Sequence, residues 1–163
     1  NMFREASAFN QPLNSWDVSK VKYMQFLFKS TIYNQPLNNW DVSSVLNMQE
    51  MFMGSDFNQP INNWEVGSVT NMYRLFRQSD FNQPLNNWDM SKVVNLGQMF
   101  YRNTGNFNQP LDNWVLSSAN SISFIFENCR SFDQPLNNWD TSTGNHFVRR
   151  ACGRRSCTTH WLG

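Results

Sequence analysis

The chain has 163 residues, 40% of them hydrophobic and 15% aromatic, and its 13 basic and 12 acidic residues give a formal net charge of +1. This length is enough for one ordinary domain. No apolar run reaches the roughly 18 to 20 residues of a membrane span, and neither a Gly-rich phosphate loop nor an Asp-rich calcium loop occurs. We expect no membrane span, no cofactor and no metal site.

An eight-residue motif, Phe-Asn-Gln-Pro-Leu-Asn-x-Trp, recurs six times with small variations. Its copies occupy residues 9–16, 33–40, 57–64, 81–88, 107–114 and 132–139. The tryptophans that end these copies lie 24, 24, 24, 26 and 25 residues apart. A fixed period of this size indicates stacked structural repeats rather than a globular enzyme core. We therefore expect all six indoles to be core residues: Trp16, Trp40, Trp64, Trp88, Trp114 and Trp139.

The segment after each motif has helical periodicity. After Trp40, the apolar residues Val45, Met48, Met51 and Phe52 are spaced i, i+3, i+6 and i+7. This pattern predicts one short helix in each repeat. A serine two residues before the first apolar position fits an N-cap. These serines are Ser19, Ser43, Ser91 and Ser117, and Gly67 replaces them in one copy.

The Phe-Asn-Gln step before each proline predicts a short extended segment. A residue before proline is pushed toward β geometry, and the missing proline N–H limits such a strand to about three residues. We expect these strands to run parallel from copy to copy. Repeat length varies only in the loop between helix and strand, which holds Gly54, Gly105 and Cys129. The motif asparagines are expected to hydrogen-bond along the array and to satisfy turn backbone.

No constellation of catalytic residues is found in the sequence. Five of the six repeat tryptophans are followed directly by an acid: Asp17, Asp41, Glu65, Asp89 and Asp140. One acid at the same place in each repeat fits electrostatic stabilisation of a helix N-terminus. Acid–base catalysis needs two carboxylates in different environments, and repeats supply the same environment each time. We expect no enzyme activity and no catalytic residue.

Residues that break the repeat are the candidates for function. On the predicted outer faces of the helices, large apolar side chains replace polar ones in some copies. They are Phe26, Met53, Tyr73, Tyr101 and Phe124. Stacked repeats would place these residues on neighbouring helices, where a contiguous patch would mark a contact surface. The alternative is a scatter of exposed apolar residues, which is normal for a protein surface.

Repetition stops after Ser142, which divides the chain into a repeat array of residues 1–142 and a basic tail of residues 143–163. The array begins inside a repeat, because Met2-Phe3 aligns with Met51-Phe52. The tail is a cap or docking segment, a basic arm, or a segment without a role. Its two cysteines suit a disulfide better than a zinc site. Four arginines of the tail are candidate partner contacts: Arg149, Arg150, Arg154 and Arg155.

The repeat resembles that of the BspA-like leucine-rich-repeat surface proteins, in particular the repeat abundant in mycoplasma lipoproteins. The matching text is the motif at 57–64, followed by Val69, Asn71-Met72 and Leu75-Phe76. The resemblance covers nearly all of residues 1–142. It implies a leucine-rich-repeat-like solenoid, at the cell surface or secreted, that binds proteins or contributes to adhesion and has no catalytic residue.

We therefore predict an α/β fold, a right-handed leucine-rich-repeat-like solenoid of six 24–26-residue repeats with short parallel strands and one short helix per repeat. As function we expect a non-enzymatic protein–protein interaction scaffold, either a surface adhesin or an accessory structural subunit of a larger assembly. Its partners would be other proteins, in a complex or at a cell surface, and no nucleic acid is expected. The alternative is a glycan-binding module that uses exposed aromatic rings.

Overall fold

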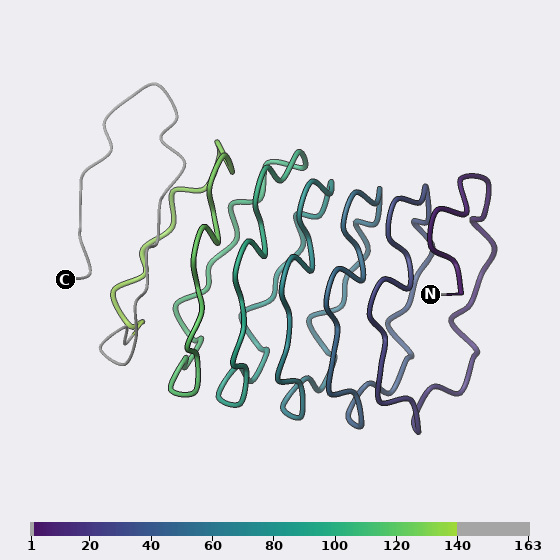
Figure 1. Cartoon of the computed structure of the whole chain (residues 1–163), viewed down its shortest axis with the longest axis horizontal. Helices are drawn as coiled ribbons and strands as arrows, with labels where there is room; N and C mark the ends of the chain where they lie inside the picture. The colour runs from purple at the N-terminus through teal and green to yellow at the C-terminus, as the bar shows by residue number, and fades with distance from the viewer. Residues whose placement is uncertain (1, 140–163) are drawn as a thin grey trace.

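The chain forms a row of similar coils that lie side by side, as the computed structural model shows (Figure 1). The structure describes residues 2–139, and the coils follow one another in chain order from one end of the row to the other. Each coil contains one copy of the repeat, so residues about one period apart in sequence are neighbours in space.

The predicted helices are absent from residues 2–139, and no multi-residue strand is found there either. Within that range, neighbouring coils are joined by single parallel bridges: Tyr23 to Asn47, Asn47 to Asn71, Asn71 to Asn95, and Asn95 to Ser121. These bridges lie at the start of the segments predicted as helices, not at the Phe-Asn-Gln steps. The prediction of an α/β, leucine-rich-repeat-like solenoid with a helix and strands in each repeat is therefore wrong.

Consecutive tight turns take the place of the helices. They occupy residues 25–30, 49–54, 73–78, 97–102 and 123–128, and we call these five segments the turn ladder. The second segment contains two consecutive tight turns. The N–H of Met51 donates to the carbonyl of Met48 at 3.1 Å and closes the first, and the N–H of Ser55 donates to the carbonyl of Phe52 at 3.2 Å and closes the second. The third residues of these two turns are Glu50 and Gly54, with φ angles of 53° and 63°, as in type II turns.

The positive φ angles direct the backbone amides of each turn toward the next coil. Alternate amides of one turn donate to carbonyls of the following turn, and the same pattern joins each pair of consecutive turns in the ladder. From the second turn to the third, the bonds are Met48 to Asn71 at 2.9 Å, Glu50 to Tyr73 at 2.9 Å, Phe52 to Leu75 at 3.1 Å and Gly54 to Arg77 at 2.8 Å. A helix would use these amides within one repeat, so bonding between coils replaces helix formation.

The core lies inside the coils and consists mainly of stacked aromatic rings. Phe52 of the turn ladder stacks on Phe57 of the next motif at 4.1 Å between ring centroids, and on Phe76 of the following coil at 5.7 Å. Val45, Met48, Met51 and Phe52 are all 0% exposed. The apolar spacing therefore identified the inward side chains, although the backbone that presents them is not helical.

The motif tryptophans and asparagines join each coil to its neighbour. The indole Nε1–H of Trp64 donates to the carbonyl of Leu37 in the preceding motif at 3.0 Å, and the other buried repeat tryptophans make the equivalent bond. The Asn34 Oδ1 atom accepts the N–H of Asn58 at 2.9 Å. Trp16 is the exception among the six expected core tryptophans, since it is 45% exposed. No earlier motif lies among the described residues to cover it.

Candidate binding surface

The outward side of the turn ladder carries the five residues that the sequence singled out. Phe26, Met53, Tyr73, Tyr101 and Phe124 lie one on each successive turn, and all five are half-buried. They project from turns, not from the predicted helices. No ring contact joins them in the described part of the chain. The five side chains thus share the outward side of the ladder, one on each turn.

Polar residues fill the positions between these apolar side chains. Phe26 and Phe124 are each the third residue of a tight turn, the position with a positive φ angle, and their φ angles are 62° and 58°. Between them, the same position is taken by Glu50, Arg74 and Gln98. Because the inward positions stay apolar while this one varies freely, the outward surface differs from one coil to the next.

Cationic side chains lie over three of the outward aromatic rings, those of Phe26, Tyr73 and Tyr101. The guanidinium carbon of Arg74 lies 4.5 Å from the ring centroid of Tyr73. The Lys29 Nζ atom and the Arg4 guanidinium carbon lie 5.5 and 5.8 Å from the centroid of Phe26. Such contacts contribute about 0.5–1 kcal/mol each at exposed sites. The surface is therefore aromatic and basic together, which the sequence analysis did not anticipate.

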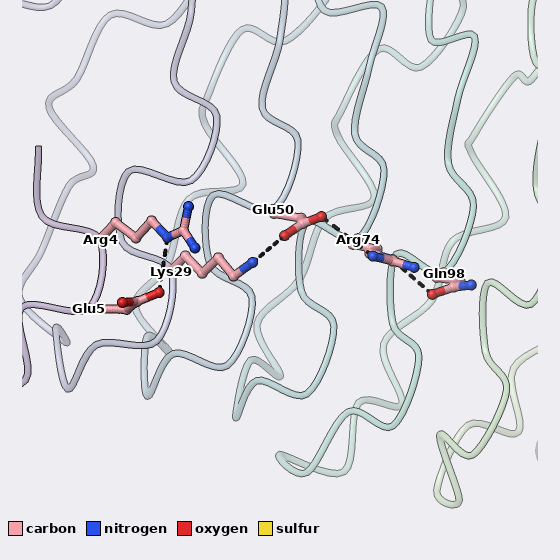
Figure 2. A network of polar contacts seen from close by, with 6 residues as sticks. All are labelled: Arg4, Glu5, Lys29, Glu50, Arg74 and Gln98. Carbon is pink, nitrogen blue, oxygen red and sulfur yellow. Dashed lines mark hydrogen bonds and ion pairs between the residues drawn. The ribbon is translucent and has the colours of Figure 1, made fainter. Parts of the chain in front are cut away.

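A line of polar contacts runs across four coils of this surface (Figure 2). Glu50 is 5% exposed, and its carboxylate lies 2.6 Å from Lys29 Nζ and 3.6 Å from the nearer terminal nitrogen of Arg74. Arg74 Nε also donates to Gln98 Oε1 at 2.9 Å. A buried carboxylate is costly unless it is paired and hydrogen-bonded, and the two cations on the flanking turns meet that need.

Further along the ladder, a second group of cations has no carboxylate. The guanidinium carbons of Arg77 and Arg102 lie 4.9 and 5.3 Å from the ring centroid of Tyr101. Neither arginine forms an ion pair with any described residue, and this includes Glu127 on the neighbouring turn. The Arg77 Nε atom is buried and has no hydrogen-bond partner. Two guanidinium groups thus share one ring, and no described carboxylate lies within ion-pair distance of either.

The acids that follow the tryptophans belong to small local turns rather than to helix N-termini. The Ser43 N–H and hydroxyl both donate to Asp41 Oδ1, at 3.0 and 2.6 Å. The Ser43 hydroxyl bond, followed by its backbone N–H bond, lowers the pKa of Asp41. The same pair of bonds forms between Ser19 and Asp17. These carboxylates are satisfied where they stand, which makes their role structural.

The third copy breaks this arrangement, because Gly67 stands in the place of the serine. A groove of about 470 Å³ opens there, with Trp64, Glu65, Gly67 and Asp89 among its lining residues. Trp64 is only 3% exposed, so its ring offers no face on which a sugar could stack. Within residues 2–139, no group of three or more His, Cys, Asp or Glu residues is placed to hold a metal ion.

The residues that sequence reasoning missed are Glu50, Lys29, Arg74, Arg77 and Arg102. Glu50 pairs with Lys29 and Arg74 on the two flanking coils, and Arg77 lies over Tyr101 of the next coil; no single repeat shows these contacts. The four arginines predicted as tail contacts, Arg149, Arg150, Arg154 and Arg155, lie outside the described residues. Among residues 2–139, no helix is long and apolar enough to cross a membrane.

Comparison with known families identifies the repeat. The family described as "Mycoplasma protein of unknown function, DUF285" matches residues 1–80 and, again, residues 55–148. The chain belongs to this family. The two DUF285 matches together cover all six motifs, which supports the resemblance to a mycoplasma repeat but does not extend to the BspA-like leucine-rich-repeat proteins. No curated protein and no solved structure matches the chain.

Proposed function

We propose that this DUF285 chain is a non-enzymatic scaffold that binds other proteins through the outward side of its turn ladder. One observation carries the proposal. The inward position held by Phe52 is phenylalanine in every turn, whereas the outward position held by Glu50 is occupied by Phe, Glu, Arg and Gln side chains. A surface that varies over a constant core is how stacked repeats present a specific contact area.

The composition of this surface supports a protein partner. Aromatic residues, methionine and arginine are enriched at protein–protein interfaces, and the ladder displays all three kinds on five neighbouring turns. Five of the six repeat indoles are 4% exposed or less, which favours the scaffold over a glycan-binding module. The scaffold would serve as a surface adhesin or as an accessory subunit of a larger assembly. The resemblance to BspA-like surface proteins favours the cell surface or secretion.

Site-specific photo-cross-linking in cells of the native source tests the proposal. A photoreactive residue is placed at Tyr73 on the ladder or, as a matched control, at Asn113, which is exposed in a motif segment. We expect the Tyr73 probe to capture a defined protein that the Asn113 probe does not. Equal capture of the same protein from both positions would contradict a ladder-specific interface.

A further inference from the structure

The unpaired arginines of the turn ladder indicate what kind of partner it takes. We propose that Arg77 and Arg102, held around the ring of Tyr101, form a binding site for the carboxylates of an extended acidic protein segment. This inference rests on the proposed scaffold function and specifies its partner.

The ladder itself shows how a carboxylate is held on this surface. Glu50 lies between Lys29 on the preceding turn and Arg74 on the following one, at 2.6 and 3.6 Å. That part of the ladder supplies its own anion. Around Tyr101, two guanidinium groups are presented from adjacent turns, and no described carboxylate pairs with them. The second group is therefore an arrangement for an anion that the described residues do not provide.

The geometry of the two arginines favours this use. The Gln78 N–H donates to the carbonyl of Tyr101 at 2.9 Å, so Arg77 and Arg102 stand on hydrogen-bonded neighbouring turns, which are about 4.8 Å apart. The Tyr101 ring restrains both side chains by cation–π contact, which reduces the conformational entropy lost when an anion binds.

An extended peptide matches the direction of the ladder. Side chains on one face of an extended chain repeat about every 6.6–6.8 Å, against about 4.8 Å between neighbouring turns, so two carboxylates separated by one residue would reach Arg77 and Arg102 with the two long arginine side chains splayed apart. Such a segment would lie along the row of coils, across the outward side of the turns. Arg130, exposed just beyond the fifth turn, extends the basic surface in the same direction.

The overall charge argues against a long polyanion such as nucleic acid. Four arginines and Asp140 lie outside residues 2–139, which leaves nine of the 13 basic and eleven of the 12 acidic residues within that range. The array is thus slightly acidic overall, with eleven acids against nine bases. A long polyanion would meet repulsion from these acids, whereas a short acidic segment needs only the local basic group.

Fluorescence anisotropy with the full chain tests the site. The probe is a fluorescein-labelled peptide of alternating Glu and Gly, compared with the same peptide in which Gln replaces Glu, at about 20 mM salt to limit screening. We expect the Glu peptide to bind and the Gln peptide to bind at least about tenfold more weakly, because charge-assisted hydrogen bonds are the stronger kind.

Two double variants with the same change in net charge complete the experiment. Arg77→Gln/Arg102→Gln removes the site, and Lys20→Gln/Lys92→Gln removes two exposed cations elsewhere. We expect about a tenfold loss of Glu-peptide affinity in the first variant and less than about twofold in the second. The tail is the same in both, and thermal unfolding checks that both fold.

Equal losses in the two variants, or no binding of the Glu peptide by the unaltered chain, would overturn the inference. Tighter binding of single-stranded DNA than of the peptide, lost in the arginine variant, would also overturn the choice of a protein partner. Photo-cross-linking from Tyr73 without binding of the acidic peptide would refute this inference alone. Cross-linking that does not distinguish the ladder from the motif segments would refute the scaffold proposal.

Discussion

Truncating a repeat tryptophan should destabilise the array strongly where neighbouring motifs cover the ring. Trp64 is 3% exposed, and a buried aromatic side chain removes about 150–250 Å² from water. At about 25 cal/mol per Å², this burial corresponds to about 4–6 kcal/mol as an upper estimate. We therefore expect Trp64→Ala to lower the free energy of unfolding by about 3–5 kcal/mol.

The lost indole hydrogen bond should add little to this effect. The Leu37 carbonyl accepts the Trp64 Nε1–H at 3.0 Å, but it also accepts the backbone N–H of Trp40 at 3.1 Å. The carbonyl therefore keeps one partner after the truncation and does not become an unsatisfied buried acceptor. Loss of buried area and the resulting cavity dominate the expected change.

Trp16→Ala provides the matched control, because Trp16 occupies the same motif position but is 45% exposed. With about half the burial, its truncation should cost about half as much, about 1.5–2.5 kcal/mol. Urea unfolding followed by circular dichroism gives both values, and fluorescence of the remaining tryptophans checks that the transitions coincide. A loss below about 1 kcal/mol for Trp64→Ala, or equal losses at the two sites, would refute the stacked-core reasoning.

Three further predictions concern single positions. The Tyr33 hydroxyl is buried and forms no hydrogen bond of good geometry, with only a weak approach to the Leu13 backbone, and burial raises the pKa of Tyr33 to about 12. Tyr33→Phe should therefore stabilise the protein by up to about 1 kcal/mol. Because the neutral form is favoured in the folded state, wild-type stability should fall from pH 10 to 12, and Tyr33→Phe should show a smaller fall in urea unfolding. Gly105→Ala should lower the melting temperature sharply, because an added Cβ would lie 1.8 Å from the carbonyl oxygen of Asp80; an unchanged melting temperature would contradict this close approach. Gln78→Gly should raise the free energy of unfolding by about 0.5–1 kcal/mol, since Gln78 has a φ of 55° and glycine adopts this conformation without the Cβ strain. A lower free energy of unfolding in the variant would show that the left-handed turn is unstrained.

The sequence predicted the side-chain positions of the repeat better than its backbone. Val45, Met48, Met51 and Phe52 are buried as the apolar spacing required. A row of tight turns, however, returns side chains to one side every three or four residues, which imitates the period of a helix. Periodicity alone therefore did not distinguish the two conformations.

Few residue types in the sequence indicated turns with positive φ angles. At the last position of the turns, Gly54 and Asn128 are residue types that tolerate positive φ. A second position with positive φ lies four residues earlier in each segment. It holds Phe26, Glu50 and Arg74 in successive copies, and none of these residue types indicates a left-handed conformation. Bonding between coils holds these residues at positive φ, and this context is invisible in any single repeat.

The candidate surface was predicted in part for the same reason. Tyr73 and Tyr101 were singled out because they depart from the repeat, and they do lie on the outward side of adjacent turns. Arg74 and Arg102 lie over the tyrosines that precede them in sequence, and Arg77 lies over Tyr101 of the next turn. The cation–π contacts that give the surface its basic character depend on side-chain orientation, which periodicity does not report.

The hydrogen bonds between coils are the basis of the whole account, and nuclear magnetic resonance detects them directly. Scalar coupling across a hydrogen bond reports which carbonyl carbon accepts a given amide. We predict a coupling from the Phe52 amide nitrogen to the Leu75 carbonyl, a pair separated by 3.1 Å between nitrogen and oxygen. A coupling from Phe52 to the Met48 carbonyl, as an α-helix would give, would contradict the turn ladder and the surface built on it.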